Sequence, residues 1–416
     1  MILSWASPEL YGQSDSIAPY SKGTHHLYFQ ANFDMNATSL TNEFISDFYM
    51  GDFLSTRLRE KISARLGDRN FAGYRMDGGL FYIFSPGDFR KKFGYYIGIE
   101  EHSLGEIRFG KNLFDLVFFG NESFIDRKLH LDNARMNLMA WQQFKAGIFK
   151  TYKNNGNIHQ FGFGVALNKG QKHFCVDVHK ASFFTQKDAE YVELDLDMDV
   201  MRTDTNNSDL LAFNGYGASA DLSYNYTDGR NHEFQLRISN IGYIRWDKSP
   251  DNFHREKAFR FDGYALPPSY LLNGLADTSF TDAGTYLDST LQAIYASDRQ
   301  KAYSVMLPLD VDMIYTYTSP GRHLSVMTQF RCRFFSLYQP YCMLKPGYTW
   351  FIKRSSIGIF PVFSIGGYGT FNAGVNISAN IGKKFFLEVG TGTLNSLLSP
   401  GNSAGLSGTI TLFKTL

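Results

Sequence analysis

The sequence predicts an all-β protein: a transmembrane antiparallel β-barrel of about 14 strands with a short helical element near its N-terminus. Three observations support this fold class. The composition is rich in Phe (38), Tyr (25) and Gly (38), apolar and polar residues alternate along most of the 416 residues, and the polar face consists mainly of small uncharged side chains. We expect residues 14–416 to form one barrel domain.

Charge and cysteine content exclude several other classes of protein. Lys and Arg (41) balance Asp and Glu (40), so the net charge of +1 gives no general attraction to nucleic acid, and no nucleic-acid partner is expected. Cys175, Cys332 and Cys342 are too few and too scattered for a disulfide framework or a zinc site. No metal or other cofactor is expected.

The first residues of the chain precede the barrel pattern. Residues 1–13 include Ile2, Leu3 and Trp5, and a polar run begins at Ser14. This segment is either the remnant of an export signal or a disordered N-terminus, and the residues leave both interpretations open.

Residues 36–68 break the strand pattern and predict two helices that form a plug-like element. The first covers residues 41–50, and the second covers residues 52–67 with Asp52 as N-cap and Gly67 as stop. Their apolar stripe consists of Phe44, Phe48, Leu54, Leu58, Ile62 and Leu66. Because the helices lie between two predicted strands, we expect them to pack inside the barrel or across its mouth.

Strand periodicity is clearest in residues 192–200, where Val192, Leu194, Leu196, Met198 and Val200 alternate with Glu193, Asp195, Asp197 and Asp199. A turn at Asp228-Gly229 predicts a hairpin between residues 222–226 and 234–238. Similar patterns occur in residues 27–33, 74–84, 93–100, 158–167, 174–183, 309–317, 324–335, 344–352, 356–365, 373–381, 384–390 and 406–416, with a less regular region at 129–150.

The character of the polar face distinguishes a membrane barrel from a soluble sandwich, since both alternate. The polar face of a soluble sandwich usually carries Lys and Glu, whereas here it is mostly Asn, Ser, Thr, Gly and Asp. Small polar side chains suit a crowded lumen, and aromatic residues near strand ends suit interfacial girdles. The expected location is the outer membrane of a Gram-negative bacterium, with outer-membrane lipid around the barrel.

Residues 249–297 form a long segment with no persistent period. Such a length is too great for a hairpin turn and predicts an extramembrane element. Its candidate partner-docking residues are Tyr264, Leu266, Tyr270, Leu271 and Leu272.

Three short stretches resemble a Bacteroidota outer-membrane β-barrel family of largely unknown function that is distantly similar to long-chain fatty-acid transporter barrels. They are residues 36–40 with the following helix, Gly120-Asn121 after residues 113–119, and residues 236–246, a strand that changes phase at 240–242. The resemblance implies export to the outer membrane, a monomeric barrel and, for some relatives, an association with type IX secretion.

The acidic row Glu193, Asp195, Asp197 and Asp199 is the most prominent candidate site. Same-face residues of a strand lie ~6.6–7 Å apart, too far for three carboxylates to share one calcium ion. We interpret the row as lumen-facing acids that line a cation-preferring pore or pair with bases such as Arg331 and Arg333.

Candidate chemistry beyond this row is sparse. His173, Asp177 and His179 share a strand face, but their spacing favours a polar lumen or rim over a metal site. No nucleophile elbow, phosphate loop or zinc-protease motif occurs, so the chain is not expected to be an enzyme.

Two functions follow from these predictions. The preferred one is an occluded structural or interaction component of the outer membrane, an accessory or plug of the type IX secretion translocon or a partner of another outer-membrane protein. The alternative is a transporter or channel for a small or hydrophobic solute. Occlusion is assigned to the helices of residues 36–68, because side chains alone do not fill a lumen of ~14 strands.

Overall fold

The computed structural model describes residues 23–87, 92–188, 190–203, 207, 210–262, 301–382 and 384–416. The N-terminal segment 1–13, interpreted above as a signal remnant or a disordered end, lies outside these residues. So do Tyr264, Leu266, Tyr270, Leu271 and Leu272, the candidate docking residues.

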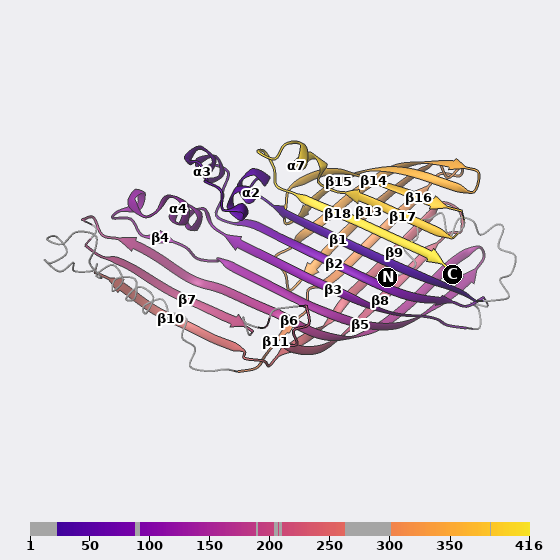
Figure 1. Cartoon of the computed structure of the whole chain (residues 1–416), viewed down its shortest axis with the longest axis horizontal. Helices are drawn as coiled ribbons and strands as arrows, with labels where there is room; N and C mark the ends of the chain where they lie inside the picture. The colour runs from indigo at the N-terminus through magenta and orange to yellow at the C-terminus, as the bar shows by residue number, and fades with distance from the viewer. Residues whose placement is uncertain are drawn as a thin grey trace.

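The described strands close into a 14-strand antiparallel barrel, which confirms the predicted fold class. The ring consists, in spatial order, of β1 (Thr24–Ala37), β2 (Asn70–Ser85), β3 (Gly94–Phe109), β5 (Arg135–Asn154), β6 (Asn157–Thr185), β8 (Gly215–Thr227), β9 (His232–Trp246), β12 (Leu309–Thr318), β13 (Leu324–Phe334), β14 (Gln339–Ile352), β15 (Ser355–Gly367), β16 (Phe371–Ile381), β17 (Phe385–Thr391) and β18 (Leu406–Thr415). Pairing of β18 with β1, in the register Thr415 to His26 and Leu406 to Met35, closes it. Figure 1 shows β18, β1, β2 and β3 side by side along one wall.

Alternation places apolar side chains on the outside of this ring and polar ones inside. On β16, Asn372, Asn376 and Ser378 are buried in the interior, while Phe371 and Ile377 are exposed. The exposed apolar belt continues around the wall, with Leu80, Ile97, Ile99, Phe144, Phe163, Leu167, Leu222, Met313, Phe330, Leu344, Ile357, Phe363 and Ile381 among its members. A closed barrel with such a belt satisfies its backbone within lipid, so the protein is an outer-membrane β-barrel.

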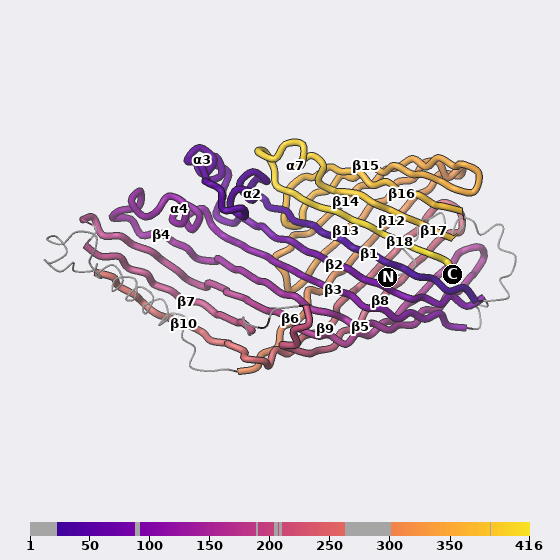
Figure 2. The backbone as a smooth tube through the Cα atoms, in the orientation of Figure 1, coloured from indigo at the N-terminus to yellow at the C-terminus, as the bar shows by residue number. Residues whose placement is uncertain are grey.

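β6 differs from its prediction because one continuous strand of 29 residues replaces the two expected at 158–167 and 174–183. Its first part pairs with β8 in the ring, from Ile158 to Gly170, and its second part pairs with β7 (Val192–Arg202). β7 pairs in turn with β10 (Asp251–Phe261), and the short β4 (Leu129–His130) pairs with the end of β6. We call β4, β7, β10 and the second part of β6 the β-extension, which projects beyond the barrel (Figure 2).

The structure confirms two local predictions. The β8–β9 hairpin turns at Asp228, whose Oδ1 accepts hydrogen bonds from the backbone N–H groups of Arg230, Asn231 and His232. The phase change on β9 is a bulge at Asn240, which adopts a positive φ of 64° and shifts the register against β8. β11 (Tyr303–Met306) continues the β12 position alongside β9.

Within the residues described, four short α-helices lie between strands, and none of them is long and apolar enough to cross a membrane. α2 (Asn42–Met50) begins after the N-cap Thr41 and ends at Gly51, close to its prediction. α3 (Thr56–Ser63) is shorter than predicted, because Ser55 rather than Asp52 caps it by accepting from the Leu58 N–H. Three further elements lie where no helix is expected from the sequence pattern: α4 (Lys111–Phe119), the 3₁₀ turn η2 (Glu122–Phe124) and α7 (Leu394–Leu398).

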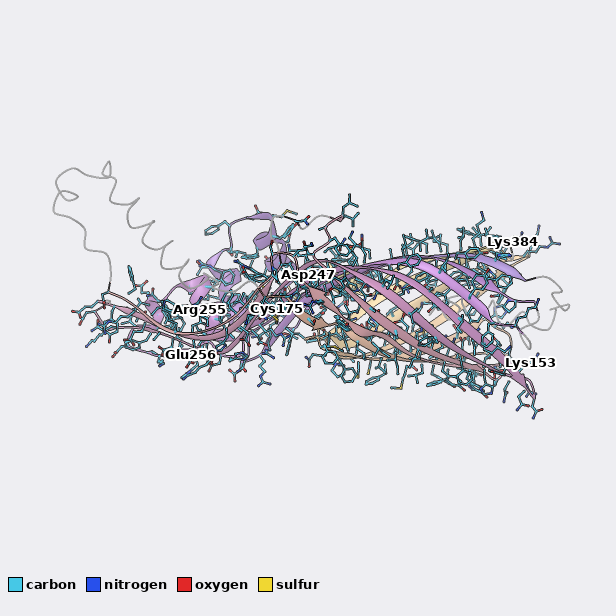
Figure 3. The ribbon with its side chains drawn as sticks, turned by 90° about the horizontal axis from the view of Figure 1, so that it is seen from below. Lys153, Cys175, Asp247, Arg255, Glu256 and Lys384 are labelled. Carbon is cyan, nitrogen blue, oxygen red and sulfur yellow. The ribbon has the colours of Figure 1, made fainter. Side chains whose placement is uncertain are left out.

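The two ends of the barrel differ in the length of their connections. Short turns join β5 to β6, β8 to β9 and β14 to β15 at the end where β1 begins and β18 ends. The helices and the β-extension occupy the other end, so that Arg255 and Glu256 lie far from Lys153 and Lys384 in Figure 3. Outer-membrane barrels have short periplasmic and long extracellular connections, so we refer to these as the periplasmic and extracellular ends.

Candidate functional site

The barrel interior contains a band of charged side chains between two aromatic clusters. Strand alternation directs Arg75 and Asp77 of β2, Glu100 and His102 of β3, Lys145 of β5, Asp221 of β8, Arg237 of β9, Asp310 and Asp312 of β12, Arg331 and Arg333 of β13, Lys345 of β14 and Glu388 of β17 inward. We call this set the charged band. Small polar residues surround it, as the sequence analysis expected of a lumen.

Ion pairs connect the charged band across strands. Asp310 accepts from two guanidinium groups, Nη1 of Arg75 at 2.7 Å and Nε of Arg333 at 2.7 Å. Lys145 bridges Glu100 at 2.7 Å and Asp221 at 2.8 Å. Further pairs join Arg75 to Asp77, Arg331 to Asp312, His102 to Asp77 and Lys345 to Glu388. Such shared partners hold the side chains in fixed positions, because moving one leaves the others uncompensated in a buried site.

A cavity of about 260 Å³ lies within the charged band. Arg333 borders it with only 1% of its side chain exposed, and its Nη1 has no hydrogen-bond partner among the described residues. Asp34 of β1 also borders it and makes no side-chain hydrogen bond or ion pair within the described chain. The buried Asn372 Oδ1 is a third group at this cavity that has no hydrogen-bond partner among the described residues. The cavity is therefore polar and incompletely satisfied.

The extracellular aromatic cluster narrows the lumen above the charged band. It contains Leu104, Met139, Trp141, Ile244, Trp246, Tyr303, Leu307, Tyr338 and Tyr368. Two of its members stand on hairpin tips rather than on strands, Tyr338 between β13 and β14 and Tyr368 between β15 and β16. The left-handed Gly366 and Gly367, with φ of 95° and 74°, end β15 just before Tyr368.

Glu106 fixes both hairpin tips over the lumen. Its Oε1 accepts from the hydroxyl of Tyr368 at 2.5 Å, from the hydroxyl of Ser336 and from the N–H of Leu337 at 3.2 Å. The guanidinium of Arg333 stacks over the Tyr338 ring, 4.2 Å from its centroid. This stacking connects the extracellular aromatic cluster to the charged band.

The periplasmic aromatic cluster lies on the opposite side of the charged band. It consists of Tyr28, Phe81, Ile83, Tyr96, Phe149, Phe386 and Phe413. These residues belong to β1, β2, β3, β5, β17 and β18, so they narrow the lumen from one half of the wall.

The predicted lumen position of Glu193, Asp195, Asp197 and Asp199 is wrong. They lie on β7, in the β-extension outside the ring. Their partners are Lys128 for Asp195, Arg260 for Glu193, and His179 and His254 for Asp199. The bases proposed for them, Arg331 and Arg333, lie in the charged band and pair with Asp312 and Asp310 instead.

The apolar stripe of the helices also differs from its prediction. Phe44, Leu58, Ile62 and Leu66 are buried against Phe109 and Phe114 at the extracellular rim, Leu54 is partly buried there, and Phe48 is exposed. No residue of α2 or α3 borders the interior cavity. The helices bury their stripe against α4 at this rim. Of the two expected placements, inside the barrel or across its mouth, the structure excludes the first.

The histidine strand face does not form one site. His173 is buried, with its Nδ1 2.9 Å from the Tyr303 hydroxyl, Asp177 pairs with Arg135, and His179 pairs with Asp199. Within the described part of the chain, no group of His, Cys, Asp and Glu is placed to hold a metal ion. The three cysteines are free.

Most residues of the charged band are not predicted as site residues from the sequence. Arg75, Glu100 and Arg237 lie in predicted strands, and Lys145 lies in the less regular region 129–150. A lone charged residue in a strand has no evident partner in the sequence. The usable signal was their phase: each occupies the face on which small polar residues alternate with the apolar belt.

Comparisons with known proteins give one family match and distant structural likenesses. The model of a family of unknown function (DUF5723) matches residues 19–390. Among curated proteins, none matches the sequence. A solved structure of the TodX deltaS2S3 mutant, a monoaromatic hydrocarbon channel, is similar with 8% identity over 96% of this chain and 93% of that chain, at a TM-score of 0.44. A FadL homologue of Pseudomonas aeruginosa is similar with 10% identity over 95% and 89%, at a TM-score of 0.39. The autotransporter NalP translocator domain from Neisseria meningitidis has 8% identity over 99% and 94%, at 0.32.

Proposed function

This chain belongs to the DUF5723 family of unknown function, and we propose from its interior that it is an outer-membrane transporter for a small solute. The observation that carries the proposal is the polar cavity of about 260 Å³ within the charged band. In this proposal the two aromatic clusters keep the resting lumen narrow, and the solute passes between them through the cavity.

The energetics of the charged band support a transport role. Replacing a buried ion-pair network with apolar residues of similar volume is often neutral or stabilising, so a barrel with a purely structural role has no need of one. Charged side chains inside membrane proteins usually mark the path of a solute or ion. The Asp310 carboxylate, shared by Arg75 and Arg333, is the centre of this network.

A hydrophobic solute is the other form of this proposal. An apolar recess of about 590 Å³ lies in the wall between β12 and β15, bordered by Met313, Phe330, Leu344 and Phe363. The interior cavity is polar, however, and a path through the charged band favours a small polar solute.

An interaction role remains a second candidate. The β-extension projects beyond the extracellular end and exposes Glu256 and Lys257 of β10, which would suit docking to another outer-membrane protein. A type IX secretion translocon is the partner that the sequence analysis predicted. Deleting residues 249–297 should abolish co-purification with such a partner and leave the heat-dependent gel shift of the barrel intact.

The transport proposal is tested by widening the lumen. Intact protein in planar bilayers should show no large steady conductance, and the quadruple variant Tyr338→Ala, Tyr368→Ala, Phe81→Ala and Phe413→Ala should conduct, because it removes side chains from both aromatic clusters. A control with the outward-facing pair Phe144→Ala and Phe163→Ala, which border neither the cavity nor the recess, should stay closed. A large current through the intact protein would contradict a narrow resting lumen. Absence of conductance in the quadruple variant would contradict a solute path through the lumen.

A further inference from the structure

Among the described residues, the interior cavity presents one acid without a partner and two arginines that are ion-paired through Nε alone. The Asp34 carboxylate borders the cavity on β1, and Arg331 and Arg333 border it on β13. Both guanidinium groups act electrostatically on Asp34, yet no ion pair within 4.0 Å joins it to either. Space therefore separates opposite charges that face the same cavity.

The arrangement of Arg75 explains why Asp34 stays unpaired. Arg75 lies directly across from Asp34 in the β1–β2 register, where a cross-strand ion pair would normally form. Its guanidinium instead donates through Nε to Asp77 at 2.6 Å and through Nη1 to Asp310 at 2.7 Å. The base opposite Asp34 in the register is thus paired with other acids.

The two arginines at the cavity have hydrogen-bond donors that their ion pairs do not use. Arg333 uses Nε for Asp310, and its buried Nη1 has no hydrogen-bond partner in the described part of the chain. Arg331 uses Nε for Asp312, and 27% of its side chain remains accessible in the cavity wall. A planar guanidinium with free Nη groups is suited to hold a carboxylate.

We propose that this cavity binds a small zwitterion of the amino-acid type, with its ammonium on Asp34 and its carboxylate on Arg331 and Arg333. A ligand with both charges satisfies Asp34 and the unpartnered Nη1 of Arg333 together, whereas a simple anion leaves Asp34 without a partner and a simple cation leaves that Nη1 without an acceptor. The cavity volume lies just below the ~300 Å³ at which pockets for drug-sized ligands begin, so the ligand is small. This inference deepens the proposed transport function by naming its solute.

Equilibrium binding to detergent-solubilised protein tests the inference without requiring transport. The probes are L-alanine, L-leucine and L-alanyl-L-alanine, with propionate and ethylamine as single-charge analogues of alanine. At least one zwitterion should bind wild-type protein more tightly than both analogues. Asp34→Asn should weaken that binding by about tenfold or more, as expected for loss of a hydrogen-bonded charge, and leave propionate binding unchanged. Arg333→Gln should weaken the binding of both the zwitterion and propionate.

The matched control is Asp195→Asn, an acid on β7 far from the cavity, which should bind as the wild type does. A heat-dependent gel shift identifies variants that fail to fold, and Asp34→Glu serves as a conservative replacement that should retain binding. Absence of zwitterion binding, or binding unaffected by Asp34→Asn, would overturn the inference. Flux of the same probes into vesicles that contain the protein separates the two proposals. Zwitterion binding without flux would contradict the transport function but not the binding site, and flux without zwitterion binding would contradict the assigned solute but not transport.

Discussion

β7 and β12 have nearly the same sequence pattern and occupy opposite environments. Asp195, Asp197 and Asp199 alternate with apolar residues on β7, and Asp310 and Asp312 do so on β12. On β12 the acids are buried in the lumen and pair with arginines, with 6% and 5% exposure. On β7 they are much more exposed and pair with Lys128, His179 and His254. Alternation therefore establishes a strand with two faces, and the partner strands determine what each face contacts.

The apolar faces of the two strands differ in the same way. Met313 and Tyr315 of β12 face outward in the lipid belt. Met198 and Val200 of β7 are buried within the β-extension against residues such as Phe253. The side-chain chemistry is alike, but one set contacts lipid and the other contacts protein.

The largest expected difference between the regions concerns removal of an acid. Asp310→Asn should destabilise the barrel by about 3–5 kcal/mol, because Arg75 and Arg333 lose their shared buried partner. Asp197→Asn on β7 should change stability by at most about 1 kcal/mol, as for exposed ion pairs. Urea unfolding in detergent measures both, and equal effects would mean that the acids of β7 and β12 are equally buried.

A basic residue on each apolar face sharpens the comparison. Ile377→Arg should hinder membrane insertion by about 2–4 kcal/mol, because Ile377 faces outward in the belt. Leu196→Arg should leave insertion of the barrel intact and disturb only the β-extension, since β7 is outside the ring. Folding into lipid vesicles, followed by the gel shift and by proteolysis of the β-extension, distinguishes these results. An insertion defect in Leu196→Arg would place β7 in the membrane wall.

The smallest effect is a pH dependence confined to the β-extension. Its hydrogen bond with Asp199 raises the pKa of His179, and although burial acts to raise the pKa of Asp199, hydrogen bonds from His179 and His254 lower it. The raised pKa of His179 contributes stability below about pH 6.5, and this stability is lost as pH rises through the pKa of His179 in the folded state. The lowered pKa of Asp199 contributes stability above about pH 4, and this stability is lost as pH falls through the pKa of Asp199 in the folded state.

Protection of β7 and β10 from proteolysis should therefore be greatest between about pH 4 and pH 6.5. His179→Gln should flatten the loss of protection toward high pH, and the barrel itself should show no matching change. An unaltered profile in that variant would mean that the His179–Asp199 pair does not stabilise the β-extension.

The sequence by itself determined the strands, their faces and much of the local chemistry. Alternation in residues 373–381 and 406–416, the Asp228 turn and the phase change at Asn240 depend on neighbours close in the chain, so local pattern sufficed to predict them. The amphipathic stripe of α2 and α3 was likewise evident, because helical periodicity needs no distant partner.

Only the tertiary structure decided which strands form the ring and which leave it. β6 continues past its partner β8, so β7 pairs outside the barrel although its pattern is the most regular in the chain. The charged band likewise depends on pairs distant in sequence, such as Arg75 with Asp310 and Glu106 with Tyr368. A strand pattern records which face is polar, but the partner of a buried charge is set by strand order, register and shear, which bring together residues that no local pattern connects.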